Sequence, residues 1–251
     1  MKAAIIKAGL AETLSSDGPF TVFAPDNDAF EAAGITTSVI ESLSGEDLKK
    51  ILLYHTLATK VEAANVPAGP NATVETINGN SIFLTSNSSG VFVNGFSVKQ
   101  ADIQADNGVI HVISSVLMPP MGNIVETAIA NENLSFLVAA VVRASEGNTN
   151  VAQVLSSEGP FTLFAPTNQA FMNAGFPDIA AIQATDPDTL TSILTYHVIA
   201  ARAFSSDLVD GANLTTLNGG TVQIGLGVNA TIKGNSNTNP SNIIAVNILT
   251  T

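Results

Sequence analysis

The sequence predicts an α+β protein built from two tandem domains. One observation is a phrase that occurs twice: GPFTVFAPDNDAF at 18–30 and GPFTLFAPTNQAF at 159–171 share ten of their thirteen residues. A second is that helical patterns precede short alternating strand patterns behind the repeated phrase. A third is the length of 251 residues, which suits two cores of about 100–150 residues each.

Further matched segments follow the repeated phrase in the same order. LKKILLYHTL at 48–57 corresponds to LTSILTYHVI at 190–199, and TINGNSI at 76–82 corresponds to TLNGGTV at 216–222. The two copies of the phrase start 141 residues apart (159 minus 18), which is too long for a solenoid repeat. The copies are therefore domains.

This alignment also predicts where the domains begin and end. We expect one domain over residues 1–120 and a second over 121–251, joined by the short, stiff segment Met118–Met121. Residues 123–138 have no counterpart in the first copy, and residues 107–120 have none in the second. We therefore expect a fragment, whose first domain lacks its first helix and whose second domain lacks its last strand.

The repeated phrase reads as a strand followed by a helix. Phe20–Phe23 is rich in β-branched and aromatic residues, and Pro25 ends the strand. A helix over 27–33 follows, closed by Gly34.

The exchange of Asp26 for Thr167 between the copies indicates what this position does. Both residues are good N-caps, because a side-chain oxygen accepts a backbone N–H at the start of the helix. A catalytic or metal-binding carboxylate would lose its charge in such an exchange. We therefore predict a cap, and we expect Phe30 and Phe171 in the cores.

Two more helices and then several short strands are predicted for the rest of each copy. The second of these helices begins at Ser44–Asp47 in the first copy and at Asp186-Pro187 in the second, both of which are helix-start signals. Asn-Gly turns separate the strand patterns. The predicted strands of the first copy are Thr73–Ile77, Ser81–Thr85, Val91–Val93, Phe96–Ile103 and Gly108–Ser114.

Composition excludes several functions. Nine basic and 21 acidic residues give a net charge of −12, which would repel nucleic acid. The absence of Cys excludes disulfides, Cys-zinc sites and thiol catalysis. No apolar run reaches the roughly 18 residues of a membrane-spanning helix, and no signal peptide stands at Met1. The scarcity of charge, 12% of residues, favours an extracellular or cell-surface protein.

The motifs together resemble a known family. FTVFAPDNDAF and FTLFAPTNQAF resemble the first signature of the fasciclin domain, and NGVIHVISSVLMP at 107–119 resembles its second. Tyr-His pairs stand where the family carries its Tyr-His motif. The resemblance spans almost the whole chain, and only the second copy departs from it, because it lacks the second signature. The residues that carry the structural signature are Thr21, Phe23, Ala24, Pro25, Asp26, Asn27, Phe30, Asn107, Gly108 and His111 in the first copy, and Thr162, Phe164, Ala165, Pro166, Thr167, Asn168 and Phe171 in the second.

The resemblance implies a fold and a role. It implies a wedge or sandwich of β-sheet in each domain with several helices along one side, and a role in cell adhesion or matrix contact. It also points to the Tyr-His pairs as partner contacts: Tyr54 and His55, and Tyr196 and His197. A few fasciclin-like proteins instead hold carotenoids, so a carrier of a small lipophilic ligand is the alternative.

The histidines can also be read as structural residues. His111 alternates onto one face with Val109 and Ile113, so we expect a hydrogen-bonded core residue. For His55 and His197, packing competes with partner contact. No G-x-S-x-G sequence occurs and no acidic pair recurs in both copies, so we expect neither catalysis nor a metal or cofactor.

The sequence thus predicts a non-catalytic adhesion protein, located outside the cell, in the periplasm or on the cell surface. We expect its partner to be a protein or polysaccharide at a cell surface or matrix, bound by two domains that gain avidity from their linkage. Five Asn-x-Ser/Thr sequons would carry glycans only in a eukaryotic secretory pathway. They are Asn71, Asn87, Asn133, Asn213 and Asn229.

Overall fold

The computed structural model describes all residues from 1 to 251 and divides into two compact units. The first unit consists of Met1–Pro119 with Phe204–Asp207. The second unit consists of Pro120–Ala203 and Leu208–Thr251. No helix in the chain combines the length and the apolar character that crossing a membrane requires.

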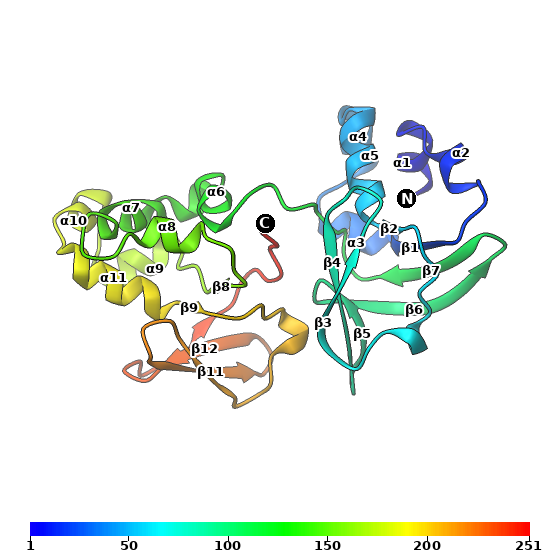
Figure 1. Ribbon diagram of the computed structural model, residues 1–251. Helices are drawn as coiled ribbons and strands as arrows, with labels where there is room; N and C mark the ends of the chain where they lie inside the picture. The colour runs from blue at the N-terminus through cyan, green and yellow to red at the C-terminus, as the bar shows by residue number, and fades with distance from the viewer. The chain divides into compact units, whose positions relative to one another are not determined.

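The first unit segregates its helices from most of its strands. Figure 1 shows α1 to α5 gathered at one end of the unit, and β3 to β7 below them. This separation is the α+β arrangement that the order of patterns predicts. The helices are α1 (Lys2–Lys7), α2 (Ala11–Leu14), α3 (Asn27–Ala32), α4 (Thr37–Ser42), α5 (Gly45–Tyr54) and the 3₁₀ turn η1 (Ala63–Asn65). The strands are β1 (Phe20–Pro25), β2 (Thr56–Leu57), β3 (Gly69–Glu75), β4 (Ser81–Asn87), β5 (Gly90–Val93), β6 (Phe96–Ala105) and β7 (Gly108–Ile113).

One sheet joins all strands of the first unit, in the order β2-β1-β7-β6-β5-β4-β3. Strand β6 connects its two halves: its first residues pair with β5, and its later residues pair with β7. The β6–β7 register shifts twice, between Val98 and Gln100 and between Gln100 and Ile103. Such irregularities bend a strand, and they lie where β6 passes from one half to the other.

The helices of the first unit close an apolar cluster of their own. Ala4 of α1, Ile40 of α4, and Leu48 and Leu52 of α5 are buried together with Leu10. Their spacing places them on the inner faces of short helices. These helices are too short to be stable alone, so packing holds them.

The second unit repeats the helical half with additions. Helix α7 corresponds to α1, and α6 has no counterpart in the first unit. A single buried cluster joins residues of α7, α8, α9, α10 and α11. The helices are α6 (Ile124–Ile129), η2 (Glu132–Leu134), α7 (Ser135–Ala144), α8 (Val151–Leu155), α9 (Asn168–Asn173), α10 (Ile179–Gln183), α11 (Pro187–Tyr196) and η3 (Ser205–Asp207), of which η3 falls within the first compact unit.

The strands of the second unit form two small sheets. One has the order β10-β11-β12-β13, and the other contains only β8 and β9. In the first unit, β1 lies between β2 and β7; in the second, the equivalent β8 pairs with β9 alone. The strands are β8 (Thr162–Leu163), β9 (Val198–Ile199), β10 (Asn213–Thr215), β11 (Thr221–Leu226), β12 (Ala230–Gly234) and β13 (Ser241–Asn242).

Most predicted elements of the first copy are confirmed within two to four residues, and one detail, the burial of Phe30, is wrong. The helix after the repeated phrase ends at Ala32, with Gly34 in the left-handed region at φ +68° just beyond it. Phe30 is only half-buried, and Ala29 is the residue of α3 that enters the core. Phe171 is buried as predicted. Helices α3 and α9 therefore turn different faces to their cores, with Ala29 buried in α3 and Phe171 buried in α9.

Candidate functional site

The N-caps predicted from the repeated phrase are present in both units. The Asp26 carboxylate accepts the backbone N–H of Ala29 at 2.8 Å, and the Thr167 hydroxyl accepts that of Ala170 at 3.3 Å. Asp26 also receives the Lys99 ammonium from β6 at 2.5 Å. This bond to Lys99, followed by the bond to Ala29, lowers the pKa of the Asp26 carboxyl, and Asp26 in turn raises the pKa of Lys99.

Tyr54 and His55, predicted as partner contacts, lie inside the first unit. Tyr54 is 0% exposed, and its hydroxyl donates to the Ser81 carbonyl at 3.1 Å. His55 is 1% exposed, and its Nδ1 lies 2.8 Å from the Ile51 carbonyl. The backbone N–H of Leu117 donates to its Nε2 at 2.9 Å. This burial speaks against direct partner contact through these two side chains.

The hydrogen bonds of His55 define a neutral ring. Because Nε2 accepts from Leu117, the ring proton is on Nδ1 and is donated to Ile51. Burial disfavours the charged ring and lowers the pKa of His55 to about 4, although the bond to Ile51 opposes this. His55 therefore stays neutral at physiological pH and acts as a packing and hydrogen-bonding residue.

Tyr196 and His197 repeat this arrangement in part. The Tyr196 hydroxyl donates to the Thr221 carbonyl at 2.6 Å, and His197 Nδ1 lies 2.8 Å from the Ile193 carbonyl. Both side chains are half-buried, unlike their counterparts. No backbone N–H donates to His197 Nε2 as Leu117 does to His55.

The threonine of the repeated phrase holds the loop that follows the Tyr-His pair. The Thr21 hydroxyl donates to the Thr59 carbonyl at 2.6 Å and accepts the backbone N–H of Val61 at 2.8 Å. Thr162 makes the same two bonds, to the Ala201 carbonyl at 2.7 Å and from the Ala203 N–H at 2.9 Å. The same loop is therefore pinned to the same strand in both units.

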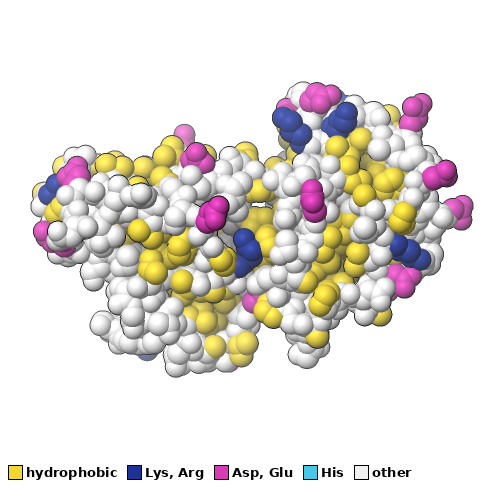
Figure 2. Space-filling model, in the orientation of Figure 1, with side chains coloured by type: hydrophobic (Ala, Val, Ile, Leu, Met, Phe, Trp, Pro, Cys, Tyr) yellow, Lys and Arg dark blue, Asp and Glu magenta, His cyan; other side chains and the backbone are white.

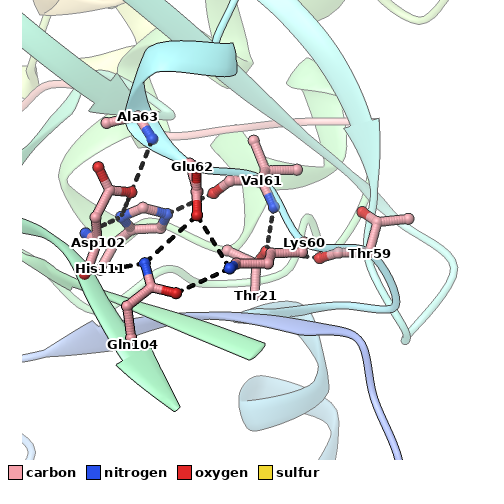
Figure 3. Close-up of polar contacts among 9 residues, drawn as sticks. All are labelled: Thr21, Thr59, Lys60, Val61, Glu62, Ala63, Asp102, Gln104 and His111. Carbon is pink, nitrogen blue, oxygen red and sulfur yellow. Dashed lines mark hydrogen bonds and ion pairs between the residues drawn. The ribbon is translucent and has the colours of Figure 1, made fainter. Parts of the chain in front are cut away.

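His111 lies at the base of this loop in the first unit (Figure 3). It is 3% exposed and stacks against Phe23 at a centroid distance of 5.4 Å, so the prediction of a core histidine is confirmed. Its Nδ1 accepts the backbone N–H of Asp102 at 3.3 Å, and its Nε2 therefore donates to the Val61 carbonyl at 2.8 Å. The ring thus connects β6 to the loop.

A polar network fixes the outer side of the same loop (Figure 3). The Lys60 ammonium lies 2.8 Å from Gln104 Oε1 and 3.0 Å from Glu62 Oε1. The backbone N–H of Ala63 donates to the Asp102 carboxylate at 2.9 Å. Asp102 has φ +59°, in the left-handed region that residues other than glycine seldom adopt. The Lys60 side chain remains 41% exposed.

A basic residue recurs at this loop, and our reading of the sequence missed it. Lys60 follows Tyr54-His55 at the same distance as Arg202 follows Tyr196-His197. Only nine basic residues occur in the chain, so a matched pair is a distinctive signal. Extending the repeat alignment past the Tyr-His pairs would have found it.

Asn107 and Gly108, which begin the second signature, both have a structural role at the start of β7. Asn107 Nδ2 donates to the carbonyls of Leu14 at 2.9 Å and Ser16 at 2.8 Å, at the end of α2. A Cβ added at Gly108 would collide with the Phe20 backbone, and one at Gly18 would collide with the Asn107 carbonyl. Only glycine, which has no Cβ, allows these two segments of backbone to approach this closely.

Asn168 has a structural role in the second unit that its counterpart Asn27 does not have in the first. Its Oδ1 accepts the Phe136 N–H at 2.9 Å, and its Nδ2 donates to the Glu132 carbonyl at 3.0 Å, which ties α9 to the start of α7. Asn27 is exposed in the first unit. Ala24 is half-buried and Pro25 buried, whereas Ala165 is exposed and Pro166 half-buried.

The turns of the repeated TINGN and TLNGG segments are also identical in form. The hydroxyls of Thr76 and Thr216 donate to the side chains of Asn78 and Asn218, at 2.7 and 2.8 Å. Asn78 Nδ2 then donates to the Lys50 carbonyl at 3.3 Å, and Asn218 Nδ2 to that of Ser192 at 3.1 Å. These repeated asparagines join the turn to the long helix before the Tyr-His pair.

Each unit contains one small apolar cavity. No three His, Asp or Glu side chains converge as metal ligands would. The two best-formed apolar cavities measure about 20 and 50 Å³, which is room for only a few water molecules. Figure 2 shows acidic side chains scattered singly over one face, with hydrophobic side chains gathered in patches between them.

Comparisons with known proteins agree with the repeated motifs. The fasciclin domain model matches residues 1–119 and again 133–251. Protein sll1483 of Synechocystis sp. is 45% identical over 121 residues, which are 47% of this chain and 66% of that protein. Transforming growth factor-beta-induced protein ig-h3 of Sus scrofa is 30% identical over 242 residues, 95% of this chain but only 34% of that protein.

A solved structure is also similar: a FAS1 domain pair from the insect cell adhesion molecule Fasciclin I, 18% identical, with a TM-score of 0.43 over 95% of this chain and 89% of that chain. The family assignment does not depend on this weak likeness. It depends on two family matches, in order, that cover both copies of the repeated phrase. This chain therefore belongs to the fasciclin domain family and carries two tandem copies of its domain.

Proposed function

We propose that this chain is a non-catalytic adhesion module of a secreted or surface-displayed protein. Its partner is a matrix protein, a cell-surface protein or a polysaccharide, bound through both fasciclin domains. Membership of the fasciclin family supports the class of function. The chain spans 66% and 34% of the two relatives named above, so this proposal concerns the domains and not a whole protein.

The observation that carries the proposal is the loop that both units hold in the same way. Thr21 and Thr162 each bracket a loop with two hydrogen bonds, directly after a Tyr-His pair. Residues 58–60 of the first loop are exposed. A rigid exposed loop loses little conformational entropy when it binds. The same structure at two places in one chain suits repeated weak contacts.

In this proposal the Tyr-His pairs support the contact surface, and the loops make the contact. Tyr54 and His55 are buried and hold the end of α5, so they set where the loop leaves the helix. Lys60 and Arg202 provide a basic side chain at matching positions. A partner with carboxylate or sulfate groups would pair with such side chains.

The test is adhesion of the whole chain to a panel of immobilised matrix proteins and acidic polysaccharides. A Lys60→Ala/Arg202→Ala variant, which removes both contacts, should bind more than about a hundredfold more weakly to a dense coating of the surface that the unchanged chain prefers. The matched control is Lys50→Ala/Lys233→Ala, which removes the same charge elsewhere and should bind normally. Equal binding by both double variants, with intact circular dichroism, would refute the loop as the contact.

No observation favours the alternative of a lipophilic-ligand carrier. Ligand sites for such molecules are typically several hundred Å³ in volume. The cavities of about 20 and 50 Å³ in this chain are far smaller. Purified protein should therefore be colourless and free of extractable lipid, which absorbance and mass spectrometry can check.

A further inference from the structure

Lys60, Glu62 and Gln104 form a closed ring of polar contacts on the outer side of the first loop (Figure 3). The Lys60 ammonium lies 3.0 Å from Glu62 Oε1 and 2.8 Å from Gln104 Oε1. Gln104 Nε2 donates to the same Glu62 oxygen at 3.4 Å. Each of the three side chains therefore contacts the other two, and the ring holds a positive and a negative charge side by side.

The ring is accessible to a partner. The side chains of Lys60 and Glu62 are 41% and 39% exposed, and Gln104 is exposed as well. The Lys60 ammonium has three N–H groups, of which Gln104 and Glu62 take two, so the ring leaves one for a partner. The other carboxylate oxygen of Glu62, Oε2, makes none of the contacts of the ring. A donor and an acceptor are thus offered next to each other.

The ion pair is not needed to hold the loop. Four hydrogen bonds from the side chains of Thr21, His111 and Asp102 already fix the backbone of this loop. An ion pair that is so exposed contributes little to stability. Its main effect is therefore on the charge that the loop presents to a partner.

The carboxylate of this pair belongs to the first loop alone. Phe204 follows Arg202 by two residues, as Glu62 follows Lys60, and Phe204 is 4% exposed. The position that supplies a carboxylate in the first loop is therefore a buried aromatic residue in the second. The basic residue is common to both loops, and Glu62 is an addition to one of them.

The charge of the chain limits which partner such a pair can bind. The formal net charge is −12, so a polyanion is repelled at long range. At short range, an anion that approaches Lys60 also meets Glu62, which lies 3.0 Å from the ammonium. A partner with an anion and a cation side by side avoids both penalties, because its anion meets Lys60 while its cation meets Glu62.

We propose that the Lys60–Glu62 pair is a contact for a protein partner that carries a carboxylate and a basic side chain next to each other. Glu62 then determines specificity, because it favours such a protein surface over a polysaccharide whose charges are all negative. The inference rests on the proposed function, since it uses the same loop and the same lysine, and it narrows the partner to a protein.

The test measures binding of the whole chain to three dense coatings by biolayer interferometry. The coatings are a copolymer of glutamate and lysine, polyglutamate, and dextran sulfate. The unchanged chain should bind the copolymer about fivefold more tightly than either polyanion, because only the copolymer matches both charges of the pair. Glu62→Gln should weaken binding to the copolymer about threefold and strengthen binding to both polyanions about threefold, because it leaves Lys60 without its carboxylate.

These opposite changes distinguish a contact from a structural role. Damage to the loop would weaken binding to all three coatings together, whereas loss of one charge of the pair changes the preference between them. The matched control is Glu75→Gln, which removes an exposed carboxylate from β3. This variant has the same net charge as Glu62→Gln and should keep the preference of the unchanged chain for the copolymer.

Two results would overturn the inference. One is tighter binding of the unchanged chain to dextran sulfate or polyglutamate than to the copolymer, which would point to a polyanion as the partner. The other is a Glu62→Gln variant whose affinities for the three coatings stay the same or all move in one direction. If Lys60→Ala/Arg202→Ala still loses binding in that case, the proposed function stands and only the role of Glu62 is refuted.

Discussion

His55 is held as a neutral ring, so the stability of the first unit should depend on pH. The pKa of His55 is about 4 in the folded chain because of burial, against about 6.5 in an unfolded chain. The unfolded state therefore binds the proton more readily between these values. Stability from the neutral ring is fully present above about pH 6.5 and is lost as the pH falls from there toward 4.

We predict that the free energy of unfolding of the first unit falls by up to about 1.4 kcal/mol per pH unit between pH 6 and 4.5 from this residue. Thermal unfolding followed by NMR signals of the first unit would measure it. A His55→Gln variant, which cannot titrate, should start less stable and show a shallower slope. The same slope in both proteins would mean that other groups cause the acid sensitivity.

Thr21 shows what a single buried hydroxyl contributes. It is 0% exposed and makes two hydrogen bonds to the loop after the Tyr-His pair. A Thr21→Val substitution keeps the shape but leaves the Thr59 carbonyl and the Val61 N–H without this partner. We expect a loss of about 1–3 kcal/mol in the free energy of unfolding.

The matched variant is Thr162→Val, which removes the same bonds at a more exposed position. We expect a smaller loss there, because water can replace the hydroxyl. Denaturant unfolding of both variants decides the comparison. A larger loss at Thr162 than at Thr21 would contradict the burial argument.

Some residue roles could be predicted from the sequence and others could not. Alternation along one strand places His111 in the core, and that prediction is confirmed. His55 follows a helix, and nothing local reveals that Leu117, 62 residues away, donates to it. Its burial depends on a contact between distant segments, so the sequence left packing and partner contact as open alternatives.

At the level of elements, the helix starts are the most local feature and the most predictable. Ser44, Asp186 and Thr167 each accept a backbone N–H at the start of the helix that follows them. Replacement of Thr167 by Ala should cost about 1 kcal/mol of stability, whereas replacement by Asp should be nearly neutral, because Asp caps the same helix in the first copy. Thermal unfolding measures both. A Thr167→Asp variant as damaged as Thr167→Ala would show that more than capping is required.

The approach of β1 to β7 gives a second prediction for an element. A side chain at Gly108 would collide with the Phe20 backbone, which cannot move without breaking the strand pair. We expect Gly108→Ala to destabilise the first unit strongly and to expose the β1–β7 amides to hydrogen exchange. The control is Gly227→Ala, where an added Cβ meets nothing. Equal protection in both variants would contradict the close approach.

Contacts between helices and strands that are far apart in the sequence are harder to predict. The burial of Phe171 is confirmed, but Phe30 at the equivalent position is only half-buried. The two phrases share ten of thirteen residues, so the difference arises from what packs around them. Asn168 binds the start of α7 through Phe136, and the first unit has no equivalent segment. Local sequence carries no information on such neighbours.

At the scale of the whole molecule, the repeat is the strongest evidence in the sequence. It predicted the tandem organisation, and the family match over 1–119 and again over 133–251 agrees with it. Lys60 and Arg202 stand in loops that Thr21 and Thr162 hold by the same two hydrogen bonds. The adhesion proposal therefore depends on a similarity that is both in the sequence and in the structure.

The central claim is that two copies of one contact act together, and dissociation from a dense ligand surface tests it most directly. We predict that Lys60→Ala and Arg202→Ala, each alone, weaken binding to a dense coating by about a hundredfold or more, because either leaves a single contact. On a sparse coating, where only one contact can form, each single variant should differ little from the unchanged chain. Single variants that bind the dense coating as tightly as the unchanged chain would contradict the claim.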